Sequence, residues 1–297
     1  TFRGCTNLTT VNLPSTLTEI GNSAFDYYED DNDEIFGCTS LKQITIPESV
    51  TKIGSSAFRS SGLTSIEIPA GVTSLGANAF AQCASLTSVI FEDTETNPAT
   101  LTKLSGSTFK ECTALKEVRL PESLTQLGSS EFNGCTALES ITLPDSVEKL
   151  GTSVFEACTS LINVTLPASL AEISISAFEG CTALASLTIP EGVTKIGNNA
   201  FSGTALTELT IPDSVTTIGK FVFENCVSMP SIFIPKTVTT LDVNVFAGWT
   251  ETQTVYIEFT EEEVEELVKN GDWKTNWAYD CNAEIVYGAT EDALPKN

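Results

Sequence analysis

Residues 178–201 read FEGCTALASLTIPEGVTKIGNNAF, and this stretch ends on the residue type with which it begins. The preceding stretch, 155–178, reads FEACTSLINVTLPASLAEISISAF, and the one before that, 132–155, reads FNGCTALESITLPDSVEKLGTSVF. One such unit is too short to bury its own Leu, Ile, Val and Phe side chains. Repetition at this short period therefore predicts a solenoid, in which each unit is buried against its neighbours.

The phenylalanine that opens each unit recurs along most of the chain. It occupies Phe2, Phe25, Phe58, Phe80, Phe109, Phe132, Phe155, Phe178, Phe201, Phe223 and Phe246. The steps between them are 22 or 23 residues, except for two longer steps of 33 and 29 residues. We therefore predict an array of about ten 22–23-residue units over residues 1–246, with insertions near 26–35 and 92–103.

Each unit can be written F-x-x-C-x-x-L-x-x-I-x-I-P-x-x-V-x-x-I-G-x-x-A. The segment L-x-x-I-x-I, as at 138–143, predicts a short strand that Pro144 ends, because proline cannot donate a ladder hydrogen bond. The segment V-x-x-I, as at 147–150, predicts a second short extended piece. Gly151 then marks a turn, where glycine tolerates a positive φ. The rest of the unit is predicted as a turn of short helical or 3-10 character, and stacked units would pair their strands in parallel.

The motif F-x-G-C-T-x-L-x-x-I-x-I-P-x-S-V-x-x-I-G-x-x-A-F resembles the BspA-like leucine-rich repeats of bacterial surface proteins, over residues 2 to about 246. This resemblance implies a curved, right-handed leucine-rich-repeat solenoid whose L-x-x-I-x-I strands line one face. It also implies a secreted or cell-surface protein, whose better-known relatives act in adhesion. Residues 25–35 and 92–103 depart from the pattern.

Cysteine recurs at one position of the repeat, three residues after the phenylalanine or, in the second unit, after Ile35. The cysteines at this position are Cys5, Cys38, Cys83, Cys112, Cys135, Cys158, Cys181 and Cys226. Ser61 and Thr204 replace it in two units, so the position does not require pairing. A metal site needs ligands that converge on one point, whereas these cysteines lie about one coil apart. We predict a structural ladder of buried free thiols, with Cys281, outside the ladder, as the reactive one.

The chain contains no histidine and has a net charge of −24. The absence of histidine excludes Ser–His–Asp and Cys–His catalytic sites and the usual zinc ligands. A two-carboxylate glycosidase stays formally open, but no pocket is implied for it. The strongly negative net charge disfavours nucleic acid and anionic membranes as partners. With no apolar run near 18 residues, we predict no enzyme, no cofactor and no membrane insertion in this fragment. It opens inside a repeat, so we expect an excerpt of a longer chain, without its signal peptide.

Outward positions of the predicted strands form the candidate ligand surface. Most carry threonine, which suits any β surface and needs no functional explanation. The atypical side chains, which are candidate ligand contacts, are Ile90, Lys116, Glu117, Arg119, Ile162 and Phe233. Tyr256 is a further candidate after Phe233.

The inserted loop at 24–36, AFDYYEDDNDEIF, is strongly acidic. Asp30, Asp31, Asp33 and Glu34 form a weak calcium candidate, because the loop lacks the glycine and the distal glutamate of an EF-hand. A solvated bulge is the plainer interpretation. Tyr27 and Tyr28 also make the loop a candidate protein contact.

Residues 247–288 leave the repeat pattern and predict a small α+β cap. Thr260 and Glu263 form a capping box, and Gly271 ends the helix. Trp273, Trp277 and a strand at 283–288 follow, with 289–297 as a tail or linker. The cap would cover the core of the last coil; a tryptophan-lined carbohydrate site is the alternative.

Together with the family resemblance, which implies a secreted or cell-surface protein, these patterns predict a non-catalytic, monomeric binding protein. Its expected role is adhesion to a host or bacterial protein or glycan through the strand-lined concave face. The alternative is a structural spacer that presents a neighbouring domain.

Overall fold

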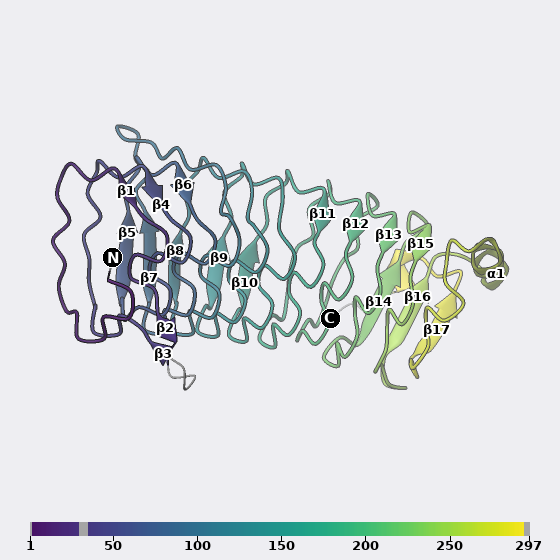
Figure 1. The fold of residues 1–297 in the computed structure, drawn as a ribbon. Helices are drawn as coiled ribbons and strands as arrows, with labels where there is room; N and C mark the ends of the chain where they lie inside the picture. Colours follow the sequence, from purple (N-terminus) through teal and green to yellow (C-terminus); the bar gives the residue numbers. More distant parts are fainter. Residues whose placement is uncertain (1, 30–34, 294–297) are drawn as a thin grey trace.

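The computed structural model describes residues 2–29 and 35–293 as one stack of coils, each lying on the coil before it (Figure 1). The chain order runs from one end of the stack to the other, so contacts between coils join residues about one repeat apart. For example, Ser140–Thr142 pairs in parallel with Asn163–Thr165. Within the described residues, no helix has the length and apolar character needed to cross a membrane.

The L-x-x-I-x-I segments form one side of the stack, which we call the strand face. Its strands are β5 (Ser65–Ile68), β7 (Ser88–Phe91), β8 (Glu117–Arg119), β9 (Ser140–Thr142), β10 (Asn163–Thr165), β14 (Ser231–Ile234), β16 (Thr254–Ile257) and β17 (Glu284–Tyr287). They make three parallel sheets, β5-β7-β8, β9-β10 and β14-β16-β17. Side chains alternate between core and solvent along each strand, as in β5, because successive residues of a strand point to opposite faces.

The V-x-x-I segments form a second side, which we call the short-strand face. Its strands are β1 (Glu19–Ile20), β4 (Lys52–Ile53), β6 (Ser74–Leu75), β11 (Glu172–Ile173), β12 (Lys195–Ile196), β13 (Thr217–Ile218) and β15 (Thr240–Leu241). They form the parallel sheets β1-β4-β6 and β11-β12-β13-β15. Single parallel bridges from Lys103 to Gln126 and from Gln126 to Lys149 lie between the two sheets. Both kinds of predicted extended segment are therefore present, although not every unit forms both of them as strands.

The turns around the phenylalanines differ from the prediction of short helical or 3-10 character. Ser153 and Ala157, two residues before and after Phe155, have φ of 57° and 58°, which no α or 3-10 helix contains. The N–H groups of Ser153, Phe155 and Ala157 donate to carbonyls of the next coil at 2.8–3.0 Å. Those N–H groups thus form a further inter-coil ladder in place of a helix.

The second residue after the repeat phenylalanine has a left-handed backbone conformation in several units, and this leads to a prediction about stability. Gly134, Gly180 and Gly203 hold this position at φ of 73°, 71° and 67°, whereas Ala157 holds it at φ 58°. Ala157→Gly is expected to stabilise the protein by about 0.5–1 kcal/mol, because a left-handed conformation costs a residue with a Cβ about 1–2 kcal/mol. Urea unfolding followed by circular dichroism checks this. Gly180→Ala should shift stability the opposite way, and equal shifts of one sign would contradict the explanation.

The core is built around a continuous column of phenylalanine rings. Ten successive pairs stack from Phe2 to Phe246, with ring centroids 5.0–6.0 Å apart and interplanar angles of 2–14°. Leu, Ile and Val side chains of both faces pack around it. The column explains the fixed repeat position, since both faces of an inner ring are covered by the rings of its two neighbours.

The two insertions are local. Residues Tyr28–Glu29 (β2) and Ile35–Phe36 (β3) pair as an antiparallel hairpin. The calcium candidates Asp30, Asp31, Asp33 and Glu34 lie outside the described residues. In the second insertion, the Asp93 carboxylate accepts hydrogen bonds from the N–H groups of Ala99 and Glu122, at 3.0 and 2.7 Å, which tie the loop to the next coil.

Glu131 is a fully buried carboxylate at a repeat position that otherwise holds Ala, Val or Thr, and this departure from the pattern is the signal that could have selected it. It accepts hydrogen bonds from the N–H groups of Gly106, Thr108 and Gly128 at 2.7, 2.9 and 3.1 Å. Burial raises its pKa, although these donors act the other way. Gly106 follows the second insertion, so Glu131 stabilises the turn at which the repeat resumes.

Residues after Phe246 lie at one end of the stack (Figure 1). Helix α1 (Glu261–Asn270) begins with the expected capping box of Thr260 and Glu263 and ends at Gly271, whose φ is 82°. Trp277 meets the last ring of the column, Phe246, edge-on at 6.2 Å. Strand β17 continues the strand face by pairing with β16, and a single 3-10 turn, η1 (Glu291–Ala293), follows.

Candidate functional site on the strand face

The cysteine ladder is a set of hydrogen bonds between coils. Seven of the eight thiols are buried. Each of these seven donates a hydrogen bond from Sγ to the main-chain carbonyl of the repeat phenylalanine in the preceding unit, at 3.0–3.2 Å. Thr204 takes the same position, but its hydroxyl donates to the carbonyl of Phe201 within its own unit, at 2.8 Å. In the last unit Trp249 takes it, and its indole N–H donates to the Phe223 carbonyl at 2.8 Å. The position therefore needs a buried donor, which explains why Cys, Thr and Trp can share it.

Cys5 departs from the predicted ladder because it is exposed. It belongs to the first coil, and its Sγ reaches the Arg3 carbonyl only at 4.0 Å. Cys281, predicted to be the reactive thiol, is half-buried, and burial raises its pKa. The most accessible thiol is thus Cys5, contrary to that prediction.

Thiol labelling tests this order. Burial raises the pKa of Cys83 to about 11 and that of Cys158 to about 12, so neither forms the reactive thiolate near neutral pH. Iodoacetamide at pH 8 is expected to modify Cys5 first, Cys281 more slowly and the seven buried thiols only after unfolding. Intact-mass and peptide mass spectrometry follow the order. Labelling of Cys158 at the rate of Cys5 in the native protein would contradict the buried ladder.

The structure brings some of the candidate ligand contacts together. Ile90 pairs in register with Glu67 on one side and with Arg119 on the other. Glu117 and Arg119 are exposed in β8, next to exposed Lys116, whereas Ile90 is half-buried. An Arg119 Nη atom donates a hydrogen bond to the Asp93 carbonyl at 3.4 Å, so this side chain is held by a residue of the second insertion.

The other candidates lie apart from this group. Phe233 and Tyr256 are register partners in β14 and β16, as predicted for a continuing row, and both are half-buried. Ile162, directly before β10, is 47% exposed. The ring of Tyr27 lies 4.1 Å below the guanidinium of Arg59 and is half-buried, and Tyr28 lies in β2. These residues do not form one patch with Arg119.

Breaks in the strand face were not predicted. Segments 184–189 and 206–211 keep the L-x-x-I-x-I pattern and its alternating burial, yet neither forms a strand. Between β10 and β14, only one backbone hydrogen bond joins neighbouring segments of this face, from Thr207 N–H to the Ala185 carbonyl at 2.9 Å. Across the same coils the short-strand face stays paired from β11 to β15. The coils therefore stay paired on the short-strand face and lose most of their pairing on the strand face.

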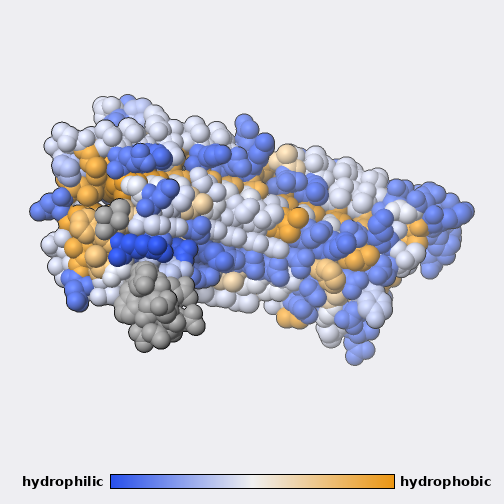
Figure 2. Space-filling view, in the orientation of Figure 1, coloured by the Kyte–Doolittle hydropathy of each residue, from blue (hydrophilic) through white to orange (hydrophobic). Residues whose placement is uncertain are grey.

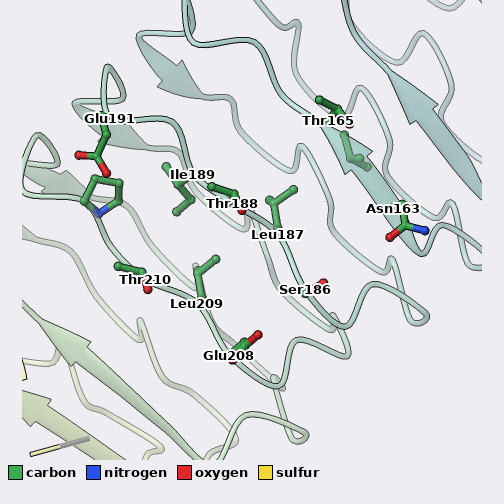
Figure 3. Close-up of a pocket in the computed structure, with 12 residues that line it drawn as sticks. Asn163, Thr165, Ser186, Leu187, Thr188, Ile189, Glu191, Glu208, Leu209 and Thr210 are labelled. Carbon is green, nitrogen blue, oxygen red and sulfur yellow. The ribbon is translucent and has the colours of Figure 1, made fainter. Parts of the chain in front are cut away.

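Hollows lie where the strand face is broken. One of them, of about 460 Å³, occupies the gap between β10 and β14 and is lined by Asn163, Val164, Thr165, Ser186, Leu187, Thr188, Ile189, Glu191, Glu208, Leu209, Thr210 and Pro212 (Figure 3). A smaller hollow of about 170 Å³ adjoins it and reaches Phe233. Another, of about 430 Å³, lies between β8 and β9 and includes Glu117 and Arg119.

A further hollow, of about 290 Å³, is lined by three carboxylates, Glu48, Glu67 and Glu92. Loss of hydration raises the pKa of Glu48, and the neighbouring charge of Glu92 raises it further. Among the described residues, no group of three or more His, Cys, Asp or Glu side chains has the arrangement to hold a metal ion.

Comparison with known proteins identifies the repeat. The profile of the BspA type leucine rich repeat region matches in six copies, over residues 1–32, 32–162, 93–203 and 158–268. No curated protein matches the chain significantly. The matched family is named for its repeat and not for an enzyme activity.

Solved structures that resemble the chain are bacterial. A leucine-rich repeat protein of T. pallidum is 27% identical, with 60% of this chain and 86% of that chain covered and a TM-score of 0.48. The pneumococcal vaccine antigen PcpA is 21% identical, with coverage of 92% and 85% and a TM-score of 0.47. A leucine-rich repeat protein from Bacteroides ovatus ATCC 8483 is 24% identical, with coverage of 96% and 79% and a TM-score of 0.39. Because the family profile matches most of its length, this β-rich chain of parallel strands and few helices belongs to the BspA-type leucine-rich repeat family.

Proposed function

We propose that this chain is a non-catalytic binding protein, secreted or on the cell surface, that adheres to a protein or glycan through the strand face. The family supports a binding role. Ile90, Glu117 and Arg119 carry the proposal, because they place apolar, acidic and basic side chains on adjoining coils in register. A spacer needs only a uniform surface, and much of the face drawn in Figure 2 is of that kind: hydrophilic and neutral side chains with narrow apolar stripes.

We also propose that the array, residues 1–246, is a curved right-handed solenoid and that residues 247–288 are its cap. Three buried contacts support the cap: Trp273 packs edge-on against Trp277 at 5.4 Å, its indole N–H donates to the Val238 carbonyl at 3.1 Å, and Gln253 donates to the carbonyls of Cys226 and Met229. Covering the last coil is what a repeat array requires at its end. We further propose that the protein acts as a monomer.

A binding screen tests the function. The purified chain is tested on immobilised matrix proteins and on a glycan array, at low and high salt, with calcium or with EDTA. A saturable hit should be weakened at least about tenfold by Arg119→Glu or Phe233→Ala, as a residue central to an interface contributes. Lys149→Glu is the matched control, since it makes the same charge change on the short-strand face.

The outcomes separate binder from spacer. Loss of the hit in Arg119→Glu but not in Lys149→Glu supports adhesion through the strand face. No hit with a folded sample favours the spacer. A hit that is lost only with EDTA and survives both strand-face variants would move the site to the acidic loop.

A further inference from the structure

The gap between β10 and β14 leaves main-chain groups without partners. In a parallel ladder each segment exchanges N–H and C=O bonds with both neighbours. Segments 186–189 and 208–211 make no backbone hydrogen bond to each other, to β10 or to β14. The hollow of about 460 Å³ lies over these segments, with buried Leu187 and Leu209 beneath it. Its floor thus combines an apolar surface with unused donors and acceptors.

The charge around this gap has one sign. Four carboxylates line the large hollow and the one that adjoins it: Glu191, Glu208, Asp213 and Glu291. No Lys or Arg lines either hollow. Within the described residues, none of the four carboxylates forms an ion pair or accepts a hydrogen bond, as the salt-bridge and side-chain contacts of these coils show. On the short-strand face of the same coils, in contrast, Lys195 lies 3.8 Å from Glu172.

We infer that this gap binds an extended peptide segment that carries Lys or Arg side chains, supplied by another protein. An extended main chain offers alternating N–H and C=O groups, which are the hydrogen-bond partners that the unpaired segments lack. Its cationic side chains would meet the uncompensated carboxylates, and its apolar stems would lie on Leu187 and Leu209. Glu191 and Glu208, shown apart in Figure 3, would then contact side chains at different points of the peptide.

Charge complementarity selects this occupant over the alternatives. An acidic glycan or a nucleic acid would be repelled by the four carboxylates. A neutral glycan would leave those charges uncompensated, and no aromatic ring lines the larger hollow for a sugar to stack on. The inference rests on the proposed function, because it names the partner class for the same strand face.

A labelled peptide tests it. The probe is a fluorescein-labelled peptide of about eight residues with alternating Lys and Thr, and its Glu–Thr counterpart is the negative probe; fluorescence anisotropy measures binding. Saturable binding of the Lys–Thr peptide is expected, about fivefold weaker in Glu191→Gln/Glu208→Gln, since each exposed ion pair contributes modestly. Binding should also weaken between about 0.02 M and about 0.5 M salt. Glu148→Gln/Glu262→Gln, with the same charge change on exposed residues outside the hollows, should bind as the unmodified protein does.

Three results would overturn the inference: no saturable binding of the Lys–Thr peptide, equal weakening in both double variants, or equal binding of the Glu–Thr peptide. Its failure is distinguishable from failure of the proposed function. A glycan or protein hit in the screen that Arg119→Glu abolishes, without binding of the basic peptide, keeps the adhesion proposal and rejects this partner class. Peptide binding that responds to Glu191 and Glu208 supports both.

Discussion

Phe155→Ala is expected to lower the free energy of unfolding by about 3–5 kcal/mol, the range for removing a fully buried aromatic side chain. The Phe155 ring is fully buried and stacks on Phe132 and on Phe178, both at a centroid distance of 5.6 Å. The substitution leaves a void in the middle of the column. Coils on both sides lose their stacking partner, because each coil is buried only by its neighbours.

The measurement is urea unfolding followed by two probes. Circular dichroism follows the whole array, whereas fluorescence follows Trp249, Trp273 and Trp277, which all lie at the C-terminal end. Repeat arrays can lose two-state behaviour when their centre is weakened. We therefore expect the two transitions to separate in Phe155→Ala, with the central coils unfolding at lower urea.

Thr165→Ala is the matched control, ten residues further along and on the strand face. Thr165 is exposed in β10, and its hydroxyl makes no hydrogen bond within the described residues, as the side-chain contacts around β10 show. Its removal should change stability by less than about 0.5 kcal/mol. Equal effects of Phe155→Ala and Thr165→Ala would contradict the assignment of core and surface positions.

Much of the fold could be predicted from the sequence because repetition applies the same physical constraint many times. A single F-x-x-C is a weak signal, but eleven phenylalanines in register indicate a core position, and all of them after Phe2 are buried. The breaks in the strand face could not be predicted in this way. Segments 184–189 and 206–211 carry the same pattern as β9 and β10, yet they do not pair as strands on that face. Pairing depends on how two neighbouring segments lie relative to each other, which the pattern of one coil does not record.

The candidate site was predicted less well for the same reason. Arg119, Glu117 and Ile90 could be selected because they depart from the threonine row, and register pairing does place them on adjoining coils. Glu191 and Glu208 did not stand out, because acidic residues are common at solvent positions throughout the repeat. Their interest arises from the gap beside them. The role of the repeat glycine was also misjudged, since Gly151 is absent from the residues with positive φ.

Gly151→Ala is expected to lower the free energy of unfolding by about 3 kcal/mol or more, at the upper end of overpacking effects. A Cβ added at Gly151 would lie 2.3 Å from the Gly128 carbonyl carbon and 2.3 Å from the Ser129 nitrogen. Both are backbone atoms of the preceding coil, so no side chain can move aside to relieve the contact. Glycine is thus needed here for the close approach of two coils.

The first coil provides the matched control at the same repeat position. Gly21 follows Ile20 as Gly151 follows Leu150, but a Cβ at Gly21 would meet no atom within 4 Å. Gly21→Ala should therefore be neutral, or stabilising by up to about 1 kcal/mol through the smaller entropy of the unfolded chain. The next coil carries Ser174 at this position, and its hydroxyl donates to the Gly151 carbonyl at 2.7 Å, so the spacing between those two coils already accommodates a Cβ. Urea unfolding of the two alanine variants decides the question: a large loss in Gly151→Ala alone supports close coil packing. Equal losses in both would instead place the requirement for glycine in the conformation of the turn itself.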